Sequence, residues 1–424
     1  MNMPGLLKSL VVVAMLTPAF SEAQVTFEVL HGFQGPPGGS PPYGALVLGT
    51  DGAVYGTTHD GGALGNGVVF KMNKDGTGFT ELHAFGSTGG AYPSAGLLDS
   101  GGVLYGTTDW GGAYDQGVVF KINEDGTDFT KLFDFDDTNG AHPIAGTLVE
   151  SGGVLYGTTS QGGTSRYGVV FKVNEDGTGF TKLHDFDLVN GGEPAAGLVD
   201  SGGVLYGTTV MGGASNRGVV FKINEDGTGF ARLHDFDGTN GAGPLEQLVD
   251  SGGVLFGTTA SGGASGNGVV FKISKDGTGF ANLHDFDGTN GASPYGGLVD
   301  SGGVLYGTTD YGGASGYDGV VFKINKDGTG FAKLHDFDGI TGAHPYAGLL
   351  DSGGALFGTT WDGGAGGGGI VFKINEDGTS FTKLTTSWTR PMVLGPAEAW
   401  SPLAARSTAR PTSAAPMAEA SCSE

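Results

Sequence analysis

The chain has 424 residues, 86 of them glycine, and a formal net charge of −23 at pH 7. Such an acidic chain repels nucleic-acid phosphates, which excludes nucleic acid as its main partner. The glycines follow no three-residue period, and the chain holds too many aliphatic and aromatic residues for a collagen or a disordered linker. Tight turns between short strands explain them better.

The first residues have the pattern of a secretory signal peptide. Lys8 supplies the positive charge, residues 10–16 form an apolar core, and Ser21 and Ala23 place small side chains before a cut at Gln24. The apolar run is shorter than the roughly 20 residues that span a bilayer. We therefore expect residues 1–23 to be a signal peptide and the mature protein to be secreted or held at the cell surface, without a transmembrane segment.

The next part of the chain repeats itself seven times with a spacing of 50 or 51 residues. The string Tyr/Phe-Gly-Thr-Thr begins at Tyr55, Tyr105, Tyr156, Tyr206, Phe256, Tyr306 and Phe357. Within residues 285–337, four apolar stretches at 297–299, 304–309, 319–325 and 330–337 alternate with turn sequences. Each stretch is too short for a helix and rich in β-branched and aromatic residues, which favours strands.

Four strands in about 50 residues is the size of one propeller blade. The sequence thus predicts an all-β protein, a β-propeller of seven four-stranded blades over residues 24–384, with a long-coil solenoid as the alternative. Residues 25–33 match the fourth strand of a repeat. We expect them to close the ring by completing the last blade, whose own fourth strand breaks off at Leu384, and we expect a monomer.

The repeat resembles a known family. The pattern GVVFKINEDGTGFTKLHDF, together with VLYGTT and a following Gly-Gly, is similar to the GloVer tandem repeat of bacterial secreted and surface proteins, and more distantly to a kelch blade. The resemblance implies a propeller-like repeat architecture and an exported bacterial protein. It implies no activity and no site residues.

Residues 385–424 depart from the repeat and are rich in Ala, Pro, Ser and Arg, which is typical of a disordered tail. The loss of a single base near codon 385 would account for the sequence of residues 385–424 in more detail. In the shifted frame, residues 385–387 permit His-Asp-Phe and residues 406–413 permit Leu-Tyr-Gly-Thr-Thr-Asp-Phe. We therefore interpret the tail as a frameshifted eighth repeat, so the intact parent gene can encode eight blades.

Two polar patterns recur in the repeats. One is the histidine of Leu-His-Asp-Phe, at His31, His83, His184, His234, His284 and His335, with Phe133 in one copy. Histidines one blade apart cannot share a metal, so we expect packing or hydrogen bonding. The other is Asp-Phe-Asp-Gly-Thr-Asn-Gly, where Asp235, Asp237 and Asn240 offer part of a Ca²⁺ site. Turn formation explains these residues better, so we expect no cofactor and no metal.

Comparison of the copies shows variation concentrated after Gly-Thr-Thr and around the proline that precedes each new repeat, whereas the A-to-B and C-to-D turns barely vary. We call the strands of a repeat A to D; the B–C and D–A loops of an antiparallel blade emerge on one face. We predict a ligand-binding face there, and Tyr43 is among the residues that vary beside the proline. Its residues are His59, Asp60, Tyr92, Asp109, Trp110, His142, Gln161, Glu193, Tyr295, Asp310, Tyr311, His344, Tyr346, Trp361 and Asp362.

Aromatic side chains on rigid loops suit recognition of a glycan or a peptide. No nucleophile elbow, His-Glu-x-x-His motif or phosphate-binding loop occurs in the repeats. The favoured hypothesis is a non-catalytic binding module. The alternatives are a propeller enzyme, a hydrolase or lyase acting on polysaccharide, and a passive structural repeat protein.

Overall fold

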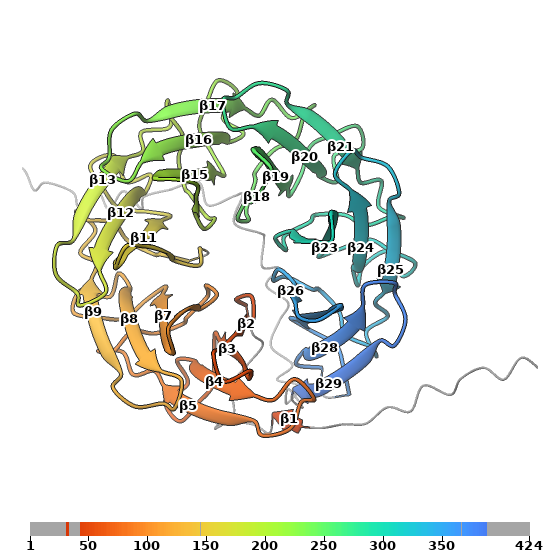
Figure 1. Ribbon diagram of the computed structural model, residues 1–424, viewed down its shortest axis with the longest axis horizontal. Helices are drawn as coiled ribbons and strands as arrows, with labels where there is room; N and C mark the ends of the chain where they lie inside the picture. The colour runs from red at the N-terminus through yellow and green to blue at the C-terminus, as the bar shows by residue number, and fades with distance from the viewer. Residues whose placement is uncertain (1–30, 34–42, 145, 366, 388–424) are drawn as a thin grey trace, which may run out of the picture. The chain divides into compact units, whose positions relative to one another are not determined.

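The computed structural model describes residues 31–33, 43–144, 146–365 and 367–387. The chain divides into two units, Met1–Arg390 and Pro391–Glu424, and all described residues belong to the first. They form seven β-sheets arranged as blades around a ring (Figure 1). This confirms the prediction of an all-β propeller with seven blades. The predicted signal peptide and the tail beyond residue 387 lie outside the described residues.

Each blade runs from the axis to the rim in chain order, as A, B, C and D (Figure 1). The A strands are β2 (Val47–Leu48), β6 (Leu98–Ser100), β10 (Val149–Ser151), β14 (Val199–Asp200), β18 (Val249–Ser251), β22 (Val299–Ser301) and β26 (Leu350–Asp351). The B strands are β3 (Val54–Thr58), β7 (Val103–Thr108), β11 (Val154–Thr159), β15 (Val204–Thr209), β19 (Val254–Thr259), β23 (Val304–Thr309) and β27 (Ala355–Thr360).

The two outer strands of each blade complete the sheet. The C strands are β4 (Val68–Met72), β8 (Val118–Asn123), β12 (Val169–Asn174), β16 (Val219–Asn224), β20 (Val269–Ser274), β24 (Val320–Asn325) and β28 (Ile370–Asn375). The D strands are β5 (Thr80–Ala84), β9 (Thr130–Asp134), β13 (Thr181–Asp185), β17 (Ala231–Asp235), β21 (Ala281–Asp285), β25 (Ala332–Asp336) and β29 (Thr382–Ser387).

The glycine of Tyr-Gly-Thr-Thr has a packing role. The blades are numbered 1 to 7 in chain order, from β2–β5 to β26–β29. In blade 6, Gly307 pairs with Phe322 across strands β23 and β24. A Cβ atom on Gly307 would lie 2.7 Å from the Cζ atom of Phe322, closer than side-chain packing allows. The absent side chain therefore lets the phenylalanine ring lie flat against the neighbouring strand, which explains why every copy of the motif has glycine there.

The hydrophobic core lies between neighbouring blades. One cluster joins Phe256 and Val270 of blade 5 to Leu305 and Phe322 of blade 6. Burying a side chain of this size is worth about 1.5–3 kcal/mol. The corresponding cluster between blades 7 and 1 contains Phe357 and Val371 together with Val54 and Phe70. The ring therefore closes through the same packing that joins its other blades.

The outer histidines tie blades together by stacking. The ring of His335 lies 3.8 Å from that of Phe381 in the next blade, with 9° between the planes. Phe133, which replaces histidine in blade 2, stacks on Phe180 in the same way at 3.6 Å and 2°. Burial lowers the pKa of His335 to about 4, so this histidine is neutral near pH 7. The packing role predicted for these histidines is confirmed.

The N-terminal strand joins the last blade, but not in the expected way. Strand β1 (His31–Phe33) pairs in parallel with β29, and His31 lies opposite Thr385. It belongs to the sheet that contains Phe372, as predicted. However, the last blade has its own D strand, which runs to Ser387 rather than stopping at Leu384. The expectation that β1 fills a missing fourth position is wrong, because β1 adds a fifth strand outside a complete blade.

Candidate functional site

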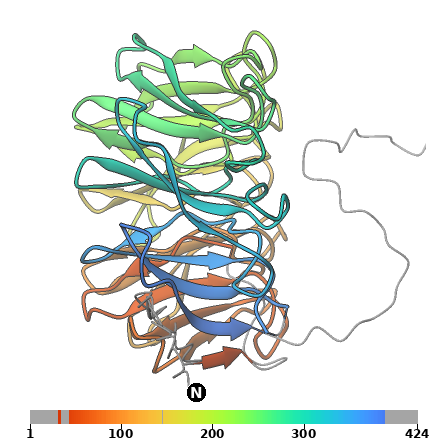
Figure 2. The same ribbon diagram turned by 90° about the vertical axis from the view of Figure 1, so that its right-hand side faces the viewer.

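The B–C and D–A loops lie on one face and are paired with each other. The D–A loop before blade 6 forms an antiparallel bridge between Ala292 and Tyr311, and the loop before blade 7 forms one between Ala343 and Asp362. Figure 2 shows the ring edge-on, with curled loops on one side and hairpin turns on the other. The predicted common face for the two families of variable loops is therefore present.

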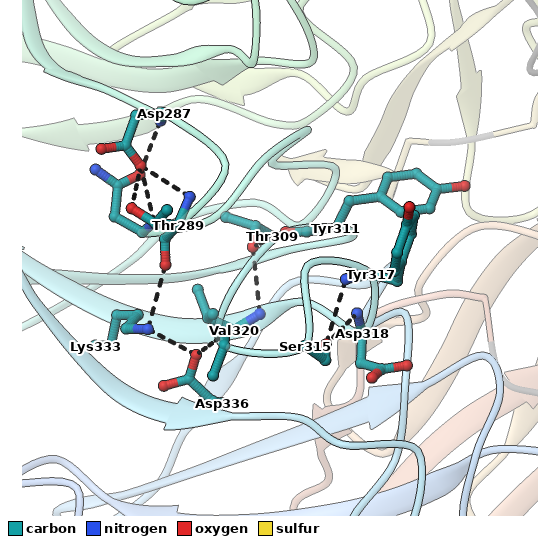
Figure 3. Close-up of polar contacts among 12 residues, drawn as sticks. Asp287, Thr289, Thr309, Tyr311, Ser315, Tyr317, Asp318, Val320, Lys333 and Asp336 are labelled. Atoms are coloured by element: carbon teal, nitrogen blue, oxygen red, sulfur yellow. Dashed lines mark hydrogen bonds and ion pairs between the residues drawn. The ribbon is translucent and has the colours of Figure 1, made fainter.

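A buried threonine holds each B–C loop. In blade 6, the hydroxyl of Thr309 donates a hydrogen bond of 2.8 Å to the carbonyl oxygen of Tyr311 and accepts one of 3.2 Å from the backbone N–H of Val320 (Figure 3). Thr309 is fully buried, and its counterpart Thr209 makes the same two bonds in blade 4. The second threonine of Gly-Thr-Thr thus orients the variable residues that follow it.

In the six D–A loops whose residue before the proline the structure describes, that residue adopts a left-handed backbone conformation. The φ angles are 59° at Tyr92, 56° at His142, 54° at Glu193, 52° at Ser293 and 58° at His344. Gly243 occupies the same position in blade 5, with φ of 62°. Glycine tolerates this region, whereas other residues are held there at a cost of about 1–3 kcal/mol. Because glycine would make the protein more stable at this position, stability does not explain why tyrosine or histidine occurs there.

The aromatic residues of blades 6, 7, 1 and 2 gather on this face, and we call this region the aromatic sector. Tyr43 lies at its centre, with ring centroids 4.8 Å from His59, 5.6 Å from Tyr346 and 6.3 Å from Trp361. The contacts continue from His59 to Tyr92 at 5.0 Å. The predicted site residues His59, Tyr92, Tyr346 and Trp361 thus form one connected surface.

The connected rings extend into blade 6. Tyr295 stacks on Tyr346 at 5.0 Å and 17°. His344 lies 6.3 Å from Trp361 and 5.0 Å from Tyr311. Three blades, 6, 7 and 1, are therefore joined by ring contacts through residues that vary between the copies.

Two aspartate–histidine pairs flank these rings. Asp109 Oδ1 lies 2.9 Å from Nδ1 of His142, and Asp310 Oδ1 lies 3.2 Å from Nδ1 of His344. Each histidine also meets the aromatic residue that follows its aspartate; for example, the ring centroids of Trp110 and His142 are 4.4 Å apart. Asp310 raises the pKa of His344 by hydrogen bonding, while burial raises the pKa of Asp310.

Three tyrosines and one glutamate occupy the inner ends of the D–A loops. We call Tyr43, Tyr295, Tyr346 and Glu246 the inner cluster. Burial raises the pKa of Tyr43 and of Tyr295 to about 12, with further increases from nearby carboxylates. Burial also raises the pKa of Glu246 well above its usual range. The three tyrosines therefore keep their protons near pH 7 and can donate hydrogen bonds, and Glu246 holds a proton more tightly than an exposed glutamate does.

Comparison with known proteins confirms the repeat family. The model of the Gloeobacter/Verrucomicrobia repeat matches residues 13–216 and 190–318. The chain belongs to this repeat family. A search of curated proteins found no significant match.

Solved propellers resemble the chain in fold. The GH74 enzyme of Niastella koreensis is 17% identical with a TM-score of 0.56, over 86% of this chain and 55% of that protein. A puromycin-hydrolyzing peptidase of Mycobacterium tuberculosis is 12% identical with a TM-score of 0.53, over 83% and 56%. The chain thus spans little more than half the length of either, and at this identity the likeness shows the fold alone.

The Gloeobacter/Verrucomicrobia repeats of blades 3, 4 and 5 have a different face, which we call the plain sector. Its B–C loop residues are Ser160, Gln161, Val210, Met211, Ala260 and Ser261. Two predicted site residues, Gln161 and Glu193, lie here; the backbone of Gln161 pairs with Ala141, the residue before His142. Asp60 and Asp362 lie in the aromatic sector, where they directly follow His59 and Trp361. Sequence comparison missed Glu246, although its position in the repeat otherwise carries only glycine or alanine.

Of the residues named for a Ca²⁺ site, Asp237 and Asn240 shape a D–A turn, and Asp235 holds a B–C loop. Oδ1 of Asp237 accepts hydrogen bonds from the N–H and hydroxyl of Thr239 and from the N–H of Asn240. Asp287 makes the same contacts one blade later (Figure 3). Asp235 accepts from the N–H of Ala214 and from Arg232. Among the described residues, no group of three or more His, Cys, Asp or Glu side chains is placed to hold a metal ion.

Proposed function

We propose that this protein is a secreted, non-catalytic binding module whose ligand, a glycan, lies across the aromatic sector. The observation that carries the proposal is that Tyr92, His142 and His344 adopt a left-handed backbone conformation before proline. Gly243 adopts the same conformation at the corresponding position without strain. Strained residues persist where the surroundings hold them for a function. Their side chains all belong to the variable face.

The chemistry of the sector suits a sugar chain. Trp110, Tyr311 and Trp361 are large aromatic residues that are 41%, 42% and 42% exposed. Buried threonines and loop bridges hold the backbones of Trp110 and Tyr311, and the N–H of Trp361 donates a hydrogen bond to the carbonyl oxygen of His344. Rigid aromatic surfaces bind the apolar faces of ligands with little loss of entropy. Nearby carboxylates accept hydrogen bonds from hydroxyl groups.

Export through a signal peptide at residues 1–23 is part of the proposal. Its support is the charge, the apolar core and the small residues before Gln24. No helix in the described part of the chain is long and apolar enough to cross a membrane. Mass spectrometry of the protein from the culture medium would show an N-terminus at Gln24, and an intact N-terminus in the cytoplasm would contradict export.

A glycan array followed by calorimetry tests the binding function. We expect Trp361→Ala and Tyr311→Ala to weaken binding of a positive glycan at least about tenfold, because aromatic anchors dominate binding energies. Met211→Ala in the plain sector is the matched control and should leave affinity unchanged. Equal losses in all three variants, or no binding by the wild type, would contradict the proposal.

The glycan identified by the array also distinguishes the binding module from the alternative, a propeller enzyme. The pairs Asp109–His142 and Asp310–His344 have the arrangement in which a carboxylate orients an imidazole for proton transfer. Incubation of the bound glycan with protein, followed by chromatography, would reveal shorter products if either pair were catalytic. The non-catalytic proposal predicts an unchanged glycan.

A further inference from the structure

One repeat differs from all others at the inner start of its A strand. The second residue after the D–A proline is small in six copies: Gly44, Ala95, Ala145, Ala196, Gly296 and Ala347. The fifth copy has Glu246 there, followed by Gln247. Blades approach closely at this level, since a Cβ atom on Gly44 would lie 2.4 Å from the carbonyl oxygen of Ala95. A glutamate at this point is therefore a departure from what packing requires.

The structure accommodates this glutamate by specific contacts. Nε2 of Gln247 donates a hydrogen bond of 2.6 Å to the carbonyl oxygen of Leu198 in blade 4. The carboxyl of Glu246 lies toward blade 6, with Oε2 3.4 Å from the position that a Cβ atom of Gly297 would take. Gln247 thus anchors the strand to one neighbour, and the glycine of the other neighbour leaves room for the carboxyl.

The half-buried carboxyl lies among acidic groups and aromatic rings. Burial raises the pKa of Tyr346, which is stacked on Tyr295, and the neighbouring Tyr295, Glu246, Asp310 and Tyr43 raise it further. No lysine or arginine occurs in the B–C and D–A loops of blades 5, 6, 7 and 1. The inner cluster therefore combines tyrosine faces with a carboxyl group that no lysine or arginine of these loops can neutralise.

We propose that the inner cluster is a subsite for a primary ammonium group, presented by an amino sugar of the glycan that the aromatic sector binds. Glu246 pairs with the ammonium, and Tyr43, Tyr295 and Tyr346 contact it through their ring faces and hydroxyls. Aromatic rings and a carboxylate together are the chemistry that recognises ammonium ions. This inference rests on the proposed glycan binding and adds the class of sugar.

The subsite has a definite dependence on pH. Because burial holds the pKa of Glu246 well above its usual range, the free protein favours the protonated carboxyl more than an exposed glutamate would. An ammonium ion stabilises the ionised carboxylate, so binding releases a proton. Affinity for an amino sugar therefore rises with pH until the amine itself loses its proton. Tyr346, whose pKa Glu246 helps to raise, and Tyr295, Tyr43 and Asp310, which also act on Tyr346, carry no positive charge, and the imidazole of His344 is hydrogen-bonded to Asp310.

Calorimetry with chitotetraose in its deacetylated and N-acetylated forms tests the subsite. We expect the wild type to prefer the deacetylated form by about tenfold, as one charged hydrogen bond provides. Glu246→Ala, which restores the residue of Ala95 and Ala347, should fold normally, bind both forms equally and release no proton. Glu246→Gln should behave like it. Equal affinities in the wild type, or a preference that survives in both variants, would overturn the inference while glycan binding stands.

A second probe separates this inference from the proposed function. If the wild type binds no oligosaccharide, methylammonium titrated into the protein and followed by NMR tests the inner cluster alone. Shifts that saturate in the wild type and are absent in Glu246→Ala would support the subsite although glycan binding fails. Identical spectra for both proteins would overturn it.

Discussion

The aromatic sector and the plain sector are built on the same blade and differ only in the residues that the blade displays. Thr309 and Thr209 hold their loops with the same two hydrogen bonds, yet Tyr311 follows in one sector and Met211 in the other. The difference teaches that the buried positions of the repeat are fixed by packing, because a change there disturbs two blades. The exposed loop positions are free to vary, and in one sector they have become aromatic and acidic.

The largest expected effect should be equal in the two sectors. Phe322→Ala in blade 6 and Phe221→Ala in blade 4 each remove a fully buried ring from a cluster between blades. Each should lower the free energy of unfolding by about 3–5 kcal/mol, measured by chemical denaturation. A difference of more than about 1 kcal/mol between them would show that the sectors do not share one scaffold.

Loss of the loop-holding hydroxyl should separate the sectors. Thr309→Val and Thr209→Val each leave a carbonyl oxygen and an N–H without their partner, so each should cost about 1–3 kcal/mol of stability. Only Thr309→Val should also weaken glycan binding, because it frees the loop that holds Tyr311. Equal binding losses from both substitutions would point to a global rather than a local effect.

The outer stacks should respond to pH alike in both sectors. Burial lowers the pKa of His335 to about 4 and also lowers that of His184, from an ordinary value of 6.5. The unfolded chain then binds more protons, so stability falls as pH falls from about 6.5 toward 4. His335→Phe, which introduces the residue that blade 2 carries as Phe133, should lose less stability than the wild type between pH 7 and pH 5 in denaturation experiments. If His335→Phe lost as much stability between pH 7 and pH 5 as the wild type, the pH dependence could not be assigned to His335.

The smallest effect concerns the strained position before proline. Glu193→Gly in the plain sector should raise stability by up to about 1 kcal/mol, because relief of strain slightly exceeds the entropic cost of glycine. His344→Gly should relieve the same strain but weaken glycan binding. Thermal unfolding measures the change in stability of both variants, and calorimetry measures their affinity for the glycan. Should Glu193→Gly also impair binding, the plain sector would belong to the site.

Seven copies of a short pattern were sufficient to predict the strands, the blade number and the face of the variable loops. Alternation of apolar stretches with Gly- and Asp-rich turns acts locally, within one repeat, and strand polarity then determines which loops share a face. The packing role of the histidines followed from the same spacing argument.

Only the tertiary structure decided which loop residues meet. The contacts of Tyr43 with Tyr346 and Trp361 cross the closure between the first and last blades, about 300 positions apart in the printed sequence. The parallel pairing of β1 with β29 also joins segments from the two ends of the repeat array. Such contacts depend on ring closure, which brings distant residues together and leaves no periodic trace in the sequence.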